Sequence, residues 1–318
     1  MLKENLTDAL KAEYTRVAYY YYKMALTQDQ ISKKMQMSRQ RVNRILKECV
    51  DRGIVKINIE GIKNAYYELE ASLEQKFGIM TVRVTESCEP ENFQTTLGVT
   101  AGAYLADILE PGDIIGFSRG LSISGLVDNM PSISKKNLVA TGLLGGWNHA
   151  ESSTNVDDII HRFSGKTGAV AQMLFAPVIV NSPDFKYSIM SELYFQEIYK
   201  VIKSCTIAVV GIGGMVSAEQ KPDEHFSEIE DEVFKSYNEH NAVGEICTHF
   251  FDASGNPVRT PMDDRLIAIS LEDYLQIPRR IGVAGTPKKL QAIIGALRGG
   301  YINVLITDLD TAETLNRI

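Results

Sequence analysis

The sequence has few cysteines, a single tryptophan and no long apolar run. The four cysteines lie far apart without a CxxC pair, which excludes a disulfide framework and a cysteine-based zinc site. They are Cys49, Cys88, Cys205 and Cys247. No apolar stretch approaches the roughly 18 residues of a membrane span, and the first residues lack the apolar core of a signal peptide. We therefore expect a cytoplasmic protein that does not enter a membrane.

Metal-binding and dinucleotide-binding patterns are absent as well. The histidines show no HxxxH spacing. The stretch VGIGGMV has Val216 where a GxGxxG dinucleotide fingerprint needs its third glycine. The sequence therefore predicts no metal, no cofactor and no catalytic residue.

Charge is distributed unevenly along the 318 residues, whose formal net charge is −7. Residues 1–60 hold 12 Lys and Arg against 7 Asp and Glu, whereas residues 61–318 hold 21 against 33. The length and the hydrophobic content of 44% fit about two domains. We expect a basic module at 1–60 that meets a polyanion and an acidic module at 61–318.

The basic module contains SRQRVNRILK, in which four of ten residues are Arg or Lys. Apolar residues recur there at i, i+3, i+4 and i+7, which predicts a helix over about 39–51. This buried stripe consists of Val42, Ile45, Leu46 and Cys49. Ser38 is a good N-cap, and Gly53 suits the position past the end.

A shorter helix, TQDQISKKM, precedes it with Thr27 as N-cap and Ile31 and Met35 facing inward. Only QMS separates the two, so the pattern predicts a helix-turn-helix. Upstream, YTRVAYYYYKM predicts a third helix with an inward stripe of Tyr14, Val17, Ala18 and Tyr21. Downstream, IVKINIE alternates like the strand of a wing.

The second helix of this pair is expected to enter the major groove of DNA. The alternative is a solvated charged face without a partner. Candidates for contacts to bases or nearby backbone are Arg39, Gln40, Arg41, Asn43 and Arg44. Candidates for phosphate contacts at helix N-termini are Thr27, Gln28 and Ser38.

From about residue 80 onward, short apolar runs alternate with amphipathic stretches. The alternation predicts an α/β domain with a parallel, doubly wound sheet, after a connecting helix at about 65–78. The expected strands are MTVRV, GDIIGFS, NLVATGLL, MLFAPVIV, TIAVVGIG, RIGVAGT and NVLITD.

Ligands of such sheets bind at the carboxyl ends of strands. In GFSRGLSISGL, a helix starting near Leu121 would offer backbone N–H groups and a hydroxyl to an anion from Arg119, Gly120, Leu121 and Ser122. In GVAGTPKKLQAI, Thr286 would cap a helix whose first position is Pro287, and Lys289 could reach a phosphate. LLGG, residues 143–146, is a third glycine-bearing strand end. Each loop alone fits a tight turn, but three together favour a small-molecule pocket.

Glu245 precedes an apolar, aromatic run in AVGEICTHFFDASGNPV. It fits a buried acceptor for a ligand hydroxyl or a charge at a strand edge, and the pattern does not decide between them.

Taken in order, these blocks resemble the SorC-type family of bacterial sugar-responsive transcription regulators over nearly the whole chain. The blocks RIGVAGTPKK and LRGGYINVLITDLDTAETL are the more specific part. The resemblance implies a winged or homeodomain-like helix-turn-helix and a Rossmann-like effector domain related to sugar-phosphate isomerases and glucosamine-phosphate deaminases. It further implies operator binding as a homotetramer or dimer of dimers, controlled by a phosphorylated sugar.

By motif match, the resemblance assigns a phosphate-cradling loop to 119–122, the acidic position to Glu245 and the phosphate-facing lysine to Lys289. Asn155 is also carried over. The chain departs from the family pattern at Thr286, where many members have glycine. At the strand end with Gly145, Leu144 replaces a cation found in some branches. This favours a reversibly bound monophosphate over a covalent imine.

We therefore expect a non-enzymatic, ligand-controlled regulator that binds double-stranded operator DNA. The main alternative is a sugar-phosphate isomerase or deaminase with a DNA-binding head, for which Glu245 is the available general base. A DNA-binding protein without a ligand would leave the glycine loops unexplained.

Overall fold

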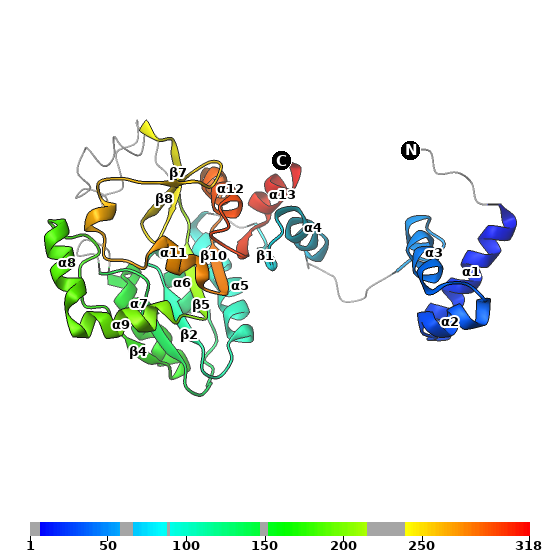
Figure 1. Cartoon of the computed structure of the whole chain (residues 1–318), viewed down its shortest axis with the longest axis horizontal. Coiled ribbons are helices and arrows are strands. Elements are labelled where there is room, and N and C mark those ends of the chain that lie inside the picture. Colours follow the sequence, from blue (N-terminus) through cyan, green and yellow to red (C-terminus); the bar gives the residue numbers. More distant parts are fainter. Residues whose placement is uncertain (1–6, 58–65, 88–89, 147–151, 215–238) are drawn as a thin grey trace. The chain divides into compact units, whose positions relative to one another are not determined.

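The structure, a computed structural model, describes residues 7–57, 66–87, 90–146, 152–214 and 239–318. The chain divides into two compact units, a first unit of residues 1–65 and a second unit of residues 66–318 (Figure 1). Each unit has its own core of apolar side chains. No helix in the described ranges is long and apolar enough to cross a membrane.

Three helices form the described part of the first unit: α1 (Asp8–Tyr22), α2 (Gln28–Met35) and α3 (Arg39–Asp51). All three contribute to one core, which consists of Tyr14, Val17, Ala18, Ile31, Val42, Ile45, Leu46 and Cys49. The Thr27 side chain forms a capping box with Gln30, and Ser38 accepts a hydrogen bond from the N–H of Arg41. The helices predicted at 27–35 and 39–51 are therefore present with their predicted caps.

Two expectations for the first unit were wrong. Tyr21 is 37% exposed and packs edge to face on Tyr22, while Tyr20 packs against the core in its place. The described part of the expected wing, residues 54–57, forms no strand, and Ile57 is 61% exposed. A strand needs a neighbour to pair with, and the described residues of this unit provide none. Residues 58–60 of the wing lie outside the described residues.

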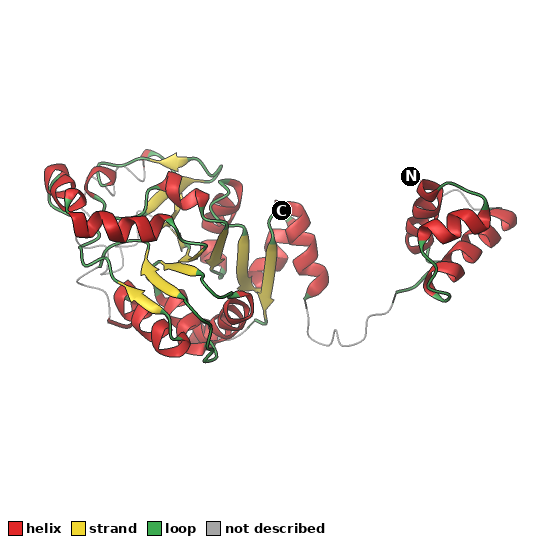
Figure 2. Ribbon diagram, turned by 60° about the horizontal axis from the view of Figure 1, so that its bottom comes forward, coloured by secondary structure: helices red, strands yellow, loops and turns green. Residues whose placement is uncertain are grey.

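The second unit is built on a parallel sheet of seven strands in the order β1-β11-β10-β5-β2-β3-β4 (Figures 1 and 2). The strands are β1 (Thr81–Thr85), β2 (Ile114–Phe117), β3 (Val139–Gly142), β4 (Val170–Gln172), β5 (Ile207–Gly211), β10 (Arg279–Val283) and β11 (Val304–Asp308). The predicted α/β fold with a parallel sheet is confirmed.

Helices cover both faces of this sheet (Figure 2). The core on one face includes side chains of α5 (Phe93–Ile108), α6 (Leu121–Asn129) and α7 (Val156–Thr167). The core on the other face includes side chains of α4 (Tyr67–Phe77), α9 (Leu193–Lys203), α11 (Leu271–Gln276), α12 (Leu290–Arg298) and α13 (Leu309–Arg317). Alternate strand residues serve the two cores: Val209 belongs to the first and Ala208 and Val210 to the second. The near-continuous apolar strands of the sequence are thus buried on both sides.

Three features of the second unit differ from the prediction. Residues 173–180, expected as a strand, form only isolated bridges at Pro177 and Ile179, and the strand β4 lies just before them. Pro177 has no N–H for a regular ladder. An additional antiparallel sheet consists of β6 (Gly213–Gly214), β7 (Ala242–Ile246), β8 (His249–Asp252) and β9 (Pro257–Val258). The helix α8 (Pro183–Ser191) precedes α9.

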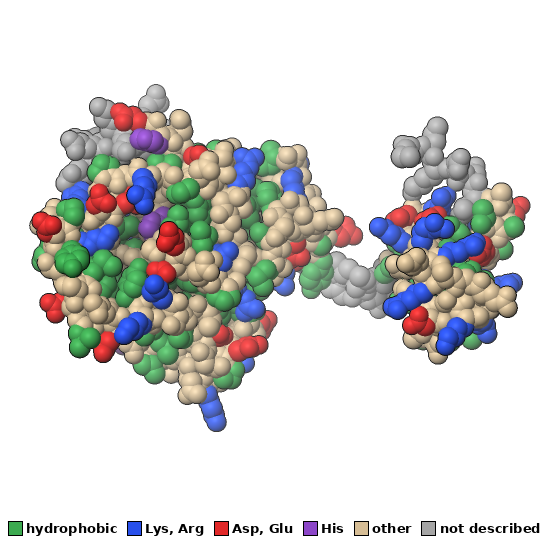
Figure 3. Space-filling model, in the orientation of Figure 1, with side chains coloured by type: hydrophobic (Ala, Val, Ile, Leu, Met, Phe, Trp, Pro, Cys, Tyr) green, Lys and Arg blue, Asp and Glu red, His purple; other side chains and the backbone are tan. Residues whose placement is uncertain are grey.

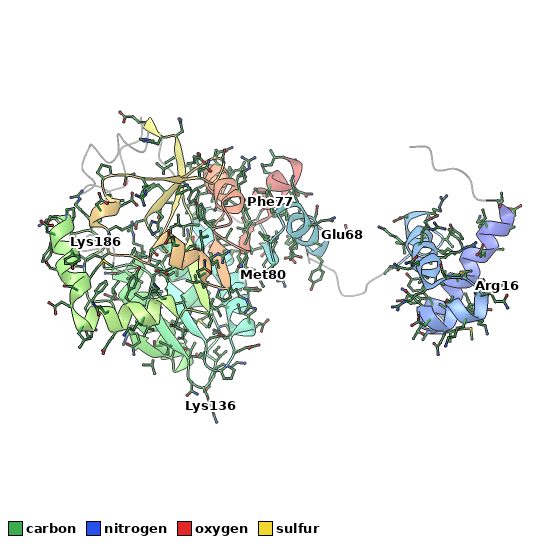
Figure 4. The ribbon with its side chains drawn as sticks, in the orientation of Figure 1. Arg16, Glu68, Phe77, Met80, Lys136 and Lys186 are labelled. Carbon is green, nitrogen blue, oxygen red and sulfur yellow. The ribbon has the colours of Figure 1, made fainter. Side chains whose placement is uncertain are left out.

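The sheet edge that carries the strands' carboxyl ends lies on the side of β7 and β8 (Figure 1). Lys136, just before β3, lies at the opposite, amino edge (Figure 4). Along the chain, β2, β3 and β4 follow one another outward on one side, and β5, β10 and β11 do so on the other. The direction reverses between β2 and β5, and this switch point is where open α/β sheets bind ligands.

Replacing Phe117 by alanine should lower the free energy of unfolding by about 3–5 kcal/mol, because the ring is completely buried. It lies 4.9 Å from the ring of Phe163, between centroids. Chemical denaturation measures the change. The control, Phe175→Ala, alters a ring that is 76% exposed and should change stability by about 0.5 kcal/mol at most. Equal effects of the two substitutions would contradict the predicted core position.

Candidate functional site

The outward face of α3 is polar over the first two turns of the helix, because the apolar residues there are directed into the core of the first unit. Arg39, Gln40, Asn43 and Arg44 are exposed on this face. The helix begins at Arg39, after its N-cap Ser38, so these residues occupy its first two turns. Figure 3 shows several Lys and Arg side chains on the visible side of this unit.

Some of these side chains are already engaged by neighbours. Arg41 forms a bidentate pair with Glu13 of α1, with Nη2 2.8 and 3.1 Å from the two carboxylate oxygens. Arg39 lies 3.6 Å from Asp29, and Gln28 donates to Asn43 at 3.5 Å. These contacts join the three helices.

Gln40 and Arg44 differ from that group. Neither side chain makes a hydrogen bond or an ion pair with the residues that the structure describes, and both are exposed. They are the side chains of this face most available to an external partner.

The second site lies at the carboxyl ends of three neighbouring strands. Arg119 follows β2, Gly213 follows β5, and Lys289 ends the short 3₁₀ helix η5 (Pro287–Lys289) that follows β10. These strands are adjacent in the order β10-β5-β2, so their ends meet at the switch point. The sheet thus assembles residues that are up to 170 positions apart in the sequence.

Glycines of β6 make room for the charged residues. Gly213 pairs with Glu245 of β7, and a Cβ on Gly213 would lie 2.4 Å from Oε1 of Glu245. A Cβ on Gly214 would lie 3.5 Å from Cγ of Lys289. Glu245 and Lys289 are therefore brought to the same short strand. Oε2 of Glu245 accepts a hydrogen bond of 2.8 Å from the N–H of Thr248, which fixes the carboxylate.

Two cations interact electrostatically with this one carboxylate. Burial lowers the pKa of Lys289, and the nearby Glu245 opposes the shift by favouring the charged form. Burial likewise lowers the pKa of Arg119, again opposed by Glu245. Arg119, Glu245 and Lys289 therefore form one half-buried cluster with an excess of positive charge, which suits an anion.

The start of α6 borders this cluster. Its N-cap, Gly120, has φ +124°, and no side chain caps the helix. The N–H of Gly120 donates to the carbonyl of Thr154 at 3.1 Å, so that group is used within the protein. Leu121 is 58% exposed, whereas Ser122 is buried. The anion-binding potential of this predicted loop therefore resides in the first-turn N–H groups from Leu121 onward.

The third predicted strand end is packed differently. Leu144 is buried, and the N–H of Gly145 donates to the carbonyl of Ile267 at 3.0 Å. A Cβ on Gly145 would lie 2.4 Å from the carbonyl oxygen of Ala176. Leu144 and Gly145 thus support the local packing, and the N–H of Gly145 is used within the protein.

Asn155 lies beside the cluster through its neighbour Thr154, which accepts from Gly120. It is the N-cap residue of α7, yet its side chain makes no capping bond. Among the described residues, Oδ1 of Asn155 is buried without a hydrogen-bond partner. Buried polar atoms are normally satisfied, so this oxygen is suited to a donor from outside the chain.

The sequence missed or misassigned several residues here. Thr286 does not cap a helix; it has φ +80° and ψ 146°, makes no capping bond, and is followed by η5 before α12 starts. Asp308, at the end of β11, accepts from the N–H of Thr286 at 2.9 Å and was not singled out. Its place at a strand end before LDTAETL, with the N-cap spacing to Thr311, was the available signal.

Comparisons with known proteins identify the family. The family described as "Putative sugar-binding domain" matches residues 63–316. The Sorbitol operon regulator of Klebsiella pneumoniae is 33% identical over 306 residues, which cover 94% of this chain and 96% of the relative. The chain therefore belongs to this sugar-binding domain family and is a transcriptional regulator of the SorC type.

Other relatives agree. The Deoxyribonucleoside regulator of Bacillus subtilis (strain 168) is 30% identical over 307 residues, or 94% of this chain and 95% of the relative. The crystal structure of the full-length Klebsiella regulator covers 97% of this chain and 100% of its own, with a TM-score of 0.76 and 30% identity. That of the "Probable sor Operon Regulator" from Shigella flexneri covers 79% of this chain and 98% of its own, with a TM-score of 0.73 and 32% identity. These relatives are named as regulators, which agrees with the prediction that the chain is not an enzyme.

Proposed function

We propose that this regulator binds double-stranded operator DNA through its basic domain at 1–60 and a phosphorylated sugar through its domain at 61–318. Binding of the sugar phosphate would change the affinity for the operator. A ligand changes that affinity only if it binds the DNA-competent and incompetent arrangements unequally. The observation that carries the proposal is the convergence of Arg119, Lys289 and Glu245 at the switch point of a sugar-binding domain.

For DNA, the pair α2 and α3 would act as a helix-turn-helix with α3 in the major groove. Gln40 and Arg44 have the hydrogen-bonding groups that read base edges, and Arg39 and Asn43 lie beside them on the exposed face. Thr27, Gln28 and Ser38 would face phosphates at the helix N-termini. Arg41 would contribute mainly by holding α3 against α1, because Glu13 engages its guanidinium.

For the effector, the phosphate would lie between Lys289, Arg119 and the first-turn N–H groups of α6. Glu245, an acceptor held by Thr248, would receive a sugar hydroxyl. Oδ1 of Asn155, which has no hydrogen-bond partner among the described residues, would accept from another hydroxyl. Since buried Leu144 offers no further cation for a second phosphate, a monophosphate fits better than a bisphosphate.

The proposal also covers the fold relationship of the effector domain, the oligomeric state and the cellular location. We infer a fold relationship of the effector domain to sugar-phosphate isomerases and deaminases, and assembly into a homotetramer or dimer of dimers in the cytoplasm. A symmetric assembly would match paired half-sites in the operator.

Operator affinity measured with and without sugar phosphates tests the function. The DNA would be duplexes selected by the protein from a random pool. Sorbitol 6-phosphate and 2-deoxyribose 5-phosphate, each compared with its unphosphorylated sugar, are chosen from the chemistry in the relatives' names. A shift with a phosphorylated compound alone is the expected result, and no shift across a wider panel of sugar phosphates would reject the proposal.

Gln40→Ala and Arg44→Ala should each weaken specific DNA binding by about 1–3 kcal/mol, because each removes a group that reads base edges. Fluorescence anisotropy with a selected duplex measures the effect. Arg16→Ala is the control, since Arg16 is exposed on α1 away from α3 (Figure 4). Unchanged affinity in both α3 variants would remove these residues from the readout.

A further inference from the structure

The loop that carries Lys289 is held in a strained conformation. Thr286 has φ +80° and ψ 146°, a region that β-branched residues rarely adopt. The preceding Gly285 has no room for a side chain, since a Cβ there would lie 2.0 Å from Oδ2 of Asp308. Such a conformation persists only where surrounding contacts enforce it.

Asp308 supplies that contact. Its Oδ2 accepts from the N–H of Thr286 at 2.9 Å and from Oγ1 of Thr311 at 2.7 Å. Its Oδ1 accepts from the N–H of Thr311 at 3.0 Å, which caps α13. The side chain is almost fully buried. One carboxylate therefore holds both the Lys289 loop and the start of α13.

The far end of α13 is bonded to α4. Nζ of Lys76 donates to the carbonyls of Leu315 and Asn316, both at 3.0 Å. Oγ of Ser72 donates to Oδ1 of Asn316 at 2.8 Å. These bonds lie at the end of α13 opposite to Asp308, so α13 joins the Lys289 loop to α4.

α4 is the first helix after the division between the two units. It is also bonded to the edge strand β1, where Glu70 and Glu74 accept from the N–H groups of Val84 and Val82, both at 2.9 Å. The chain thus enters the second unit through a helix that is held by polar bonds at the sheet edge and at α13.

We propose that Asp308 is a positioning residue that connects occupancy of the Lys289 loop, through α13, to α4 and hence to the DNA affinity of the first unit. This inference rests on the proposed function. A phosphate bound at Lys289 would shift the strained Gly285–Thr286 segment. Because Asp308 is hydrogen-bonded to both Thr286 and Thr311, this shift would move the start of α13. The DNA-competent and incompetent arrangements would then differ in how α13 holds α4.

The first test is Asp308→Asn in the full chain. Asn has a single accepting oxygen, because its amide nitrogen only donates. It can therefore hold the N–H of Thr286 or the N–H of Thr311 but not both, so the double anchor is lost while side-chain size is kept. The matched control is Asp113→Asn at the amino edge, where the carboxylate also accepts from a backbone N–H (Glu110, 2.8 Å) and a threonine hydroxyl (Thr206, 2.7 Å).

The second test, Lys76→Met, removes two of the three hydrogen bonds described above between α4 and the far end of α13 and leaves Asp308 intact. Its control is Lys186→Met, since Lys186 also donates to a backbone carbonyl, that of Asp263, at 3.0 Å. It lies on the side of the second unit away from α4 (Figure 4).

The readout is the ratio of operator dissociation constants with and without sorbitol 6-phosphate or 2-deoxyribose 5-phosphate, together with calorimetric affinity for the compound. The wild type and both controls should show a ratio of about 10 or more, and Asp308→Asn and Lys76→Met a ratio below about 2. Operator affinity without ligand should stay within about two-fold, which a loss of fold would not allow.

The outcomes separate the two proposals. Full regulation in both variants would overturn the connection through α13 and leave the effector site intact. Absence of binding by the wild type across the wider panel of sugar phosphates would overturn the effector site, and the connection with it. Lost regulation with retained compound binding, in both variants but neither control, is the result that supports Asp308 as the positioning residue.

Discussion

Replacing Lys289 by methionine is expected to lower the affinity for a sugar phosphate by about 2–4 kcal/mol, or about 30- to 700-fold. The ammonium is the cation that η5 places beside Glu245 and the glycines of β6. Its loss removes a charge-assisted bond to the phosphate and leaves the Glu245 carboxylate without one of its two cationic neighbours. Methionine keeps most of the aliphatic stem, so packing against Gly214 changes little.

Calorimetric titration with the compound that shifts operator affinity measures the loss. Lys288→Met is a close control, because Lys288 belongs to the same 3₁₀ helix but is exposed. It should change the affinity by less than about three-fold, as expected for a screened surface charge. Operator affinity in the absence of ligand should be unchanged in both variants. Similar losses for the two lysines would mean that the phosphate senses only the overall charge of the loop.

The helices of the first unit could be predicted because caps and apolar spacing are properties of neighbouring residues. Thr27 and Ser38 each cap a helix whose apolar residues recur at helical spacing, and a cap and a period need no knowledge of distant residues. The described part of the expected wing, residues 54–57, forms no strand, because a strand depends on a partner. Ile57 alternates correctly with its neighbours, but alternation alone does not supply another strand.

The parallel sheet was predictable for a similar reason, since strands buried on both faces read as apolar runs. The segment at 173–180 shows the limit of that signal. It is as apolar as the true strands, but it makes isolated bridges to Gly146 and Leu266, and Pro177 cannot continue a ladder.

Part of the candidate site could be predicted from the sequence, and part could not. Arg119 and Lys289 follow strands in sequence, so their place at the carboxyl edge follows from the topology. Glu245 could not be placed from its neighbours, because its proximity to Lys289 depends on pairing with Gly213 across 31 intervening residues. The glycines of VGIGGMV, which do not fit a dinucleotide fingerprint, provide the space for that carboxylate.

Gly145 was predicted to bind the ligand, but its N–H is used within the fold. A glycine at a strand end fits an anion-binding loop, but its N–H is taken by the carbonyl of Ile267, more than 120 residues later. Only the completed fold shows which backbone groups remain for a ligand.

Residues 66–318 alone should bind the sugar phosphate within about two-fold of the full chain and should lose specific operator binding entirely. The second unit has its own cores, and the cluster of Arg119, Glu245 and Lys289 draws only on its strands. The Shigella structure covers 79% of this chain, about the share that residues 66–318 make up, and we expect a piece of this size to fold by itself. The piece lacks Gln40 and Arg44, and residues 61–318 hold 21 Lys and Arg against 33 Asp and Glu, so affinity for a polyanion should fall by at least about 10³-fold.

Calorimetry and anisotropy measure the two affinities, and the full chain carrying Arg44→Ala is the control that keeps both units. The coupling between ligand affinity and operator affinity is reciprocal, which adds a second measurement. If ligand and operator affect one another in the full chain, adding operator must change the ligand affinity by the factor by which ligand changes operator affinity. In residues 66–318 the operator should change nothing. A ligand affinity that still responded to operator in this piece would place a DNA contact in the second unit and contradict the division of roles between the two units.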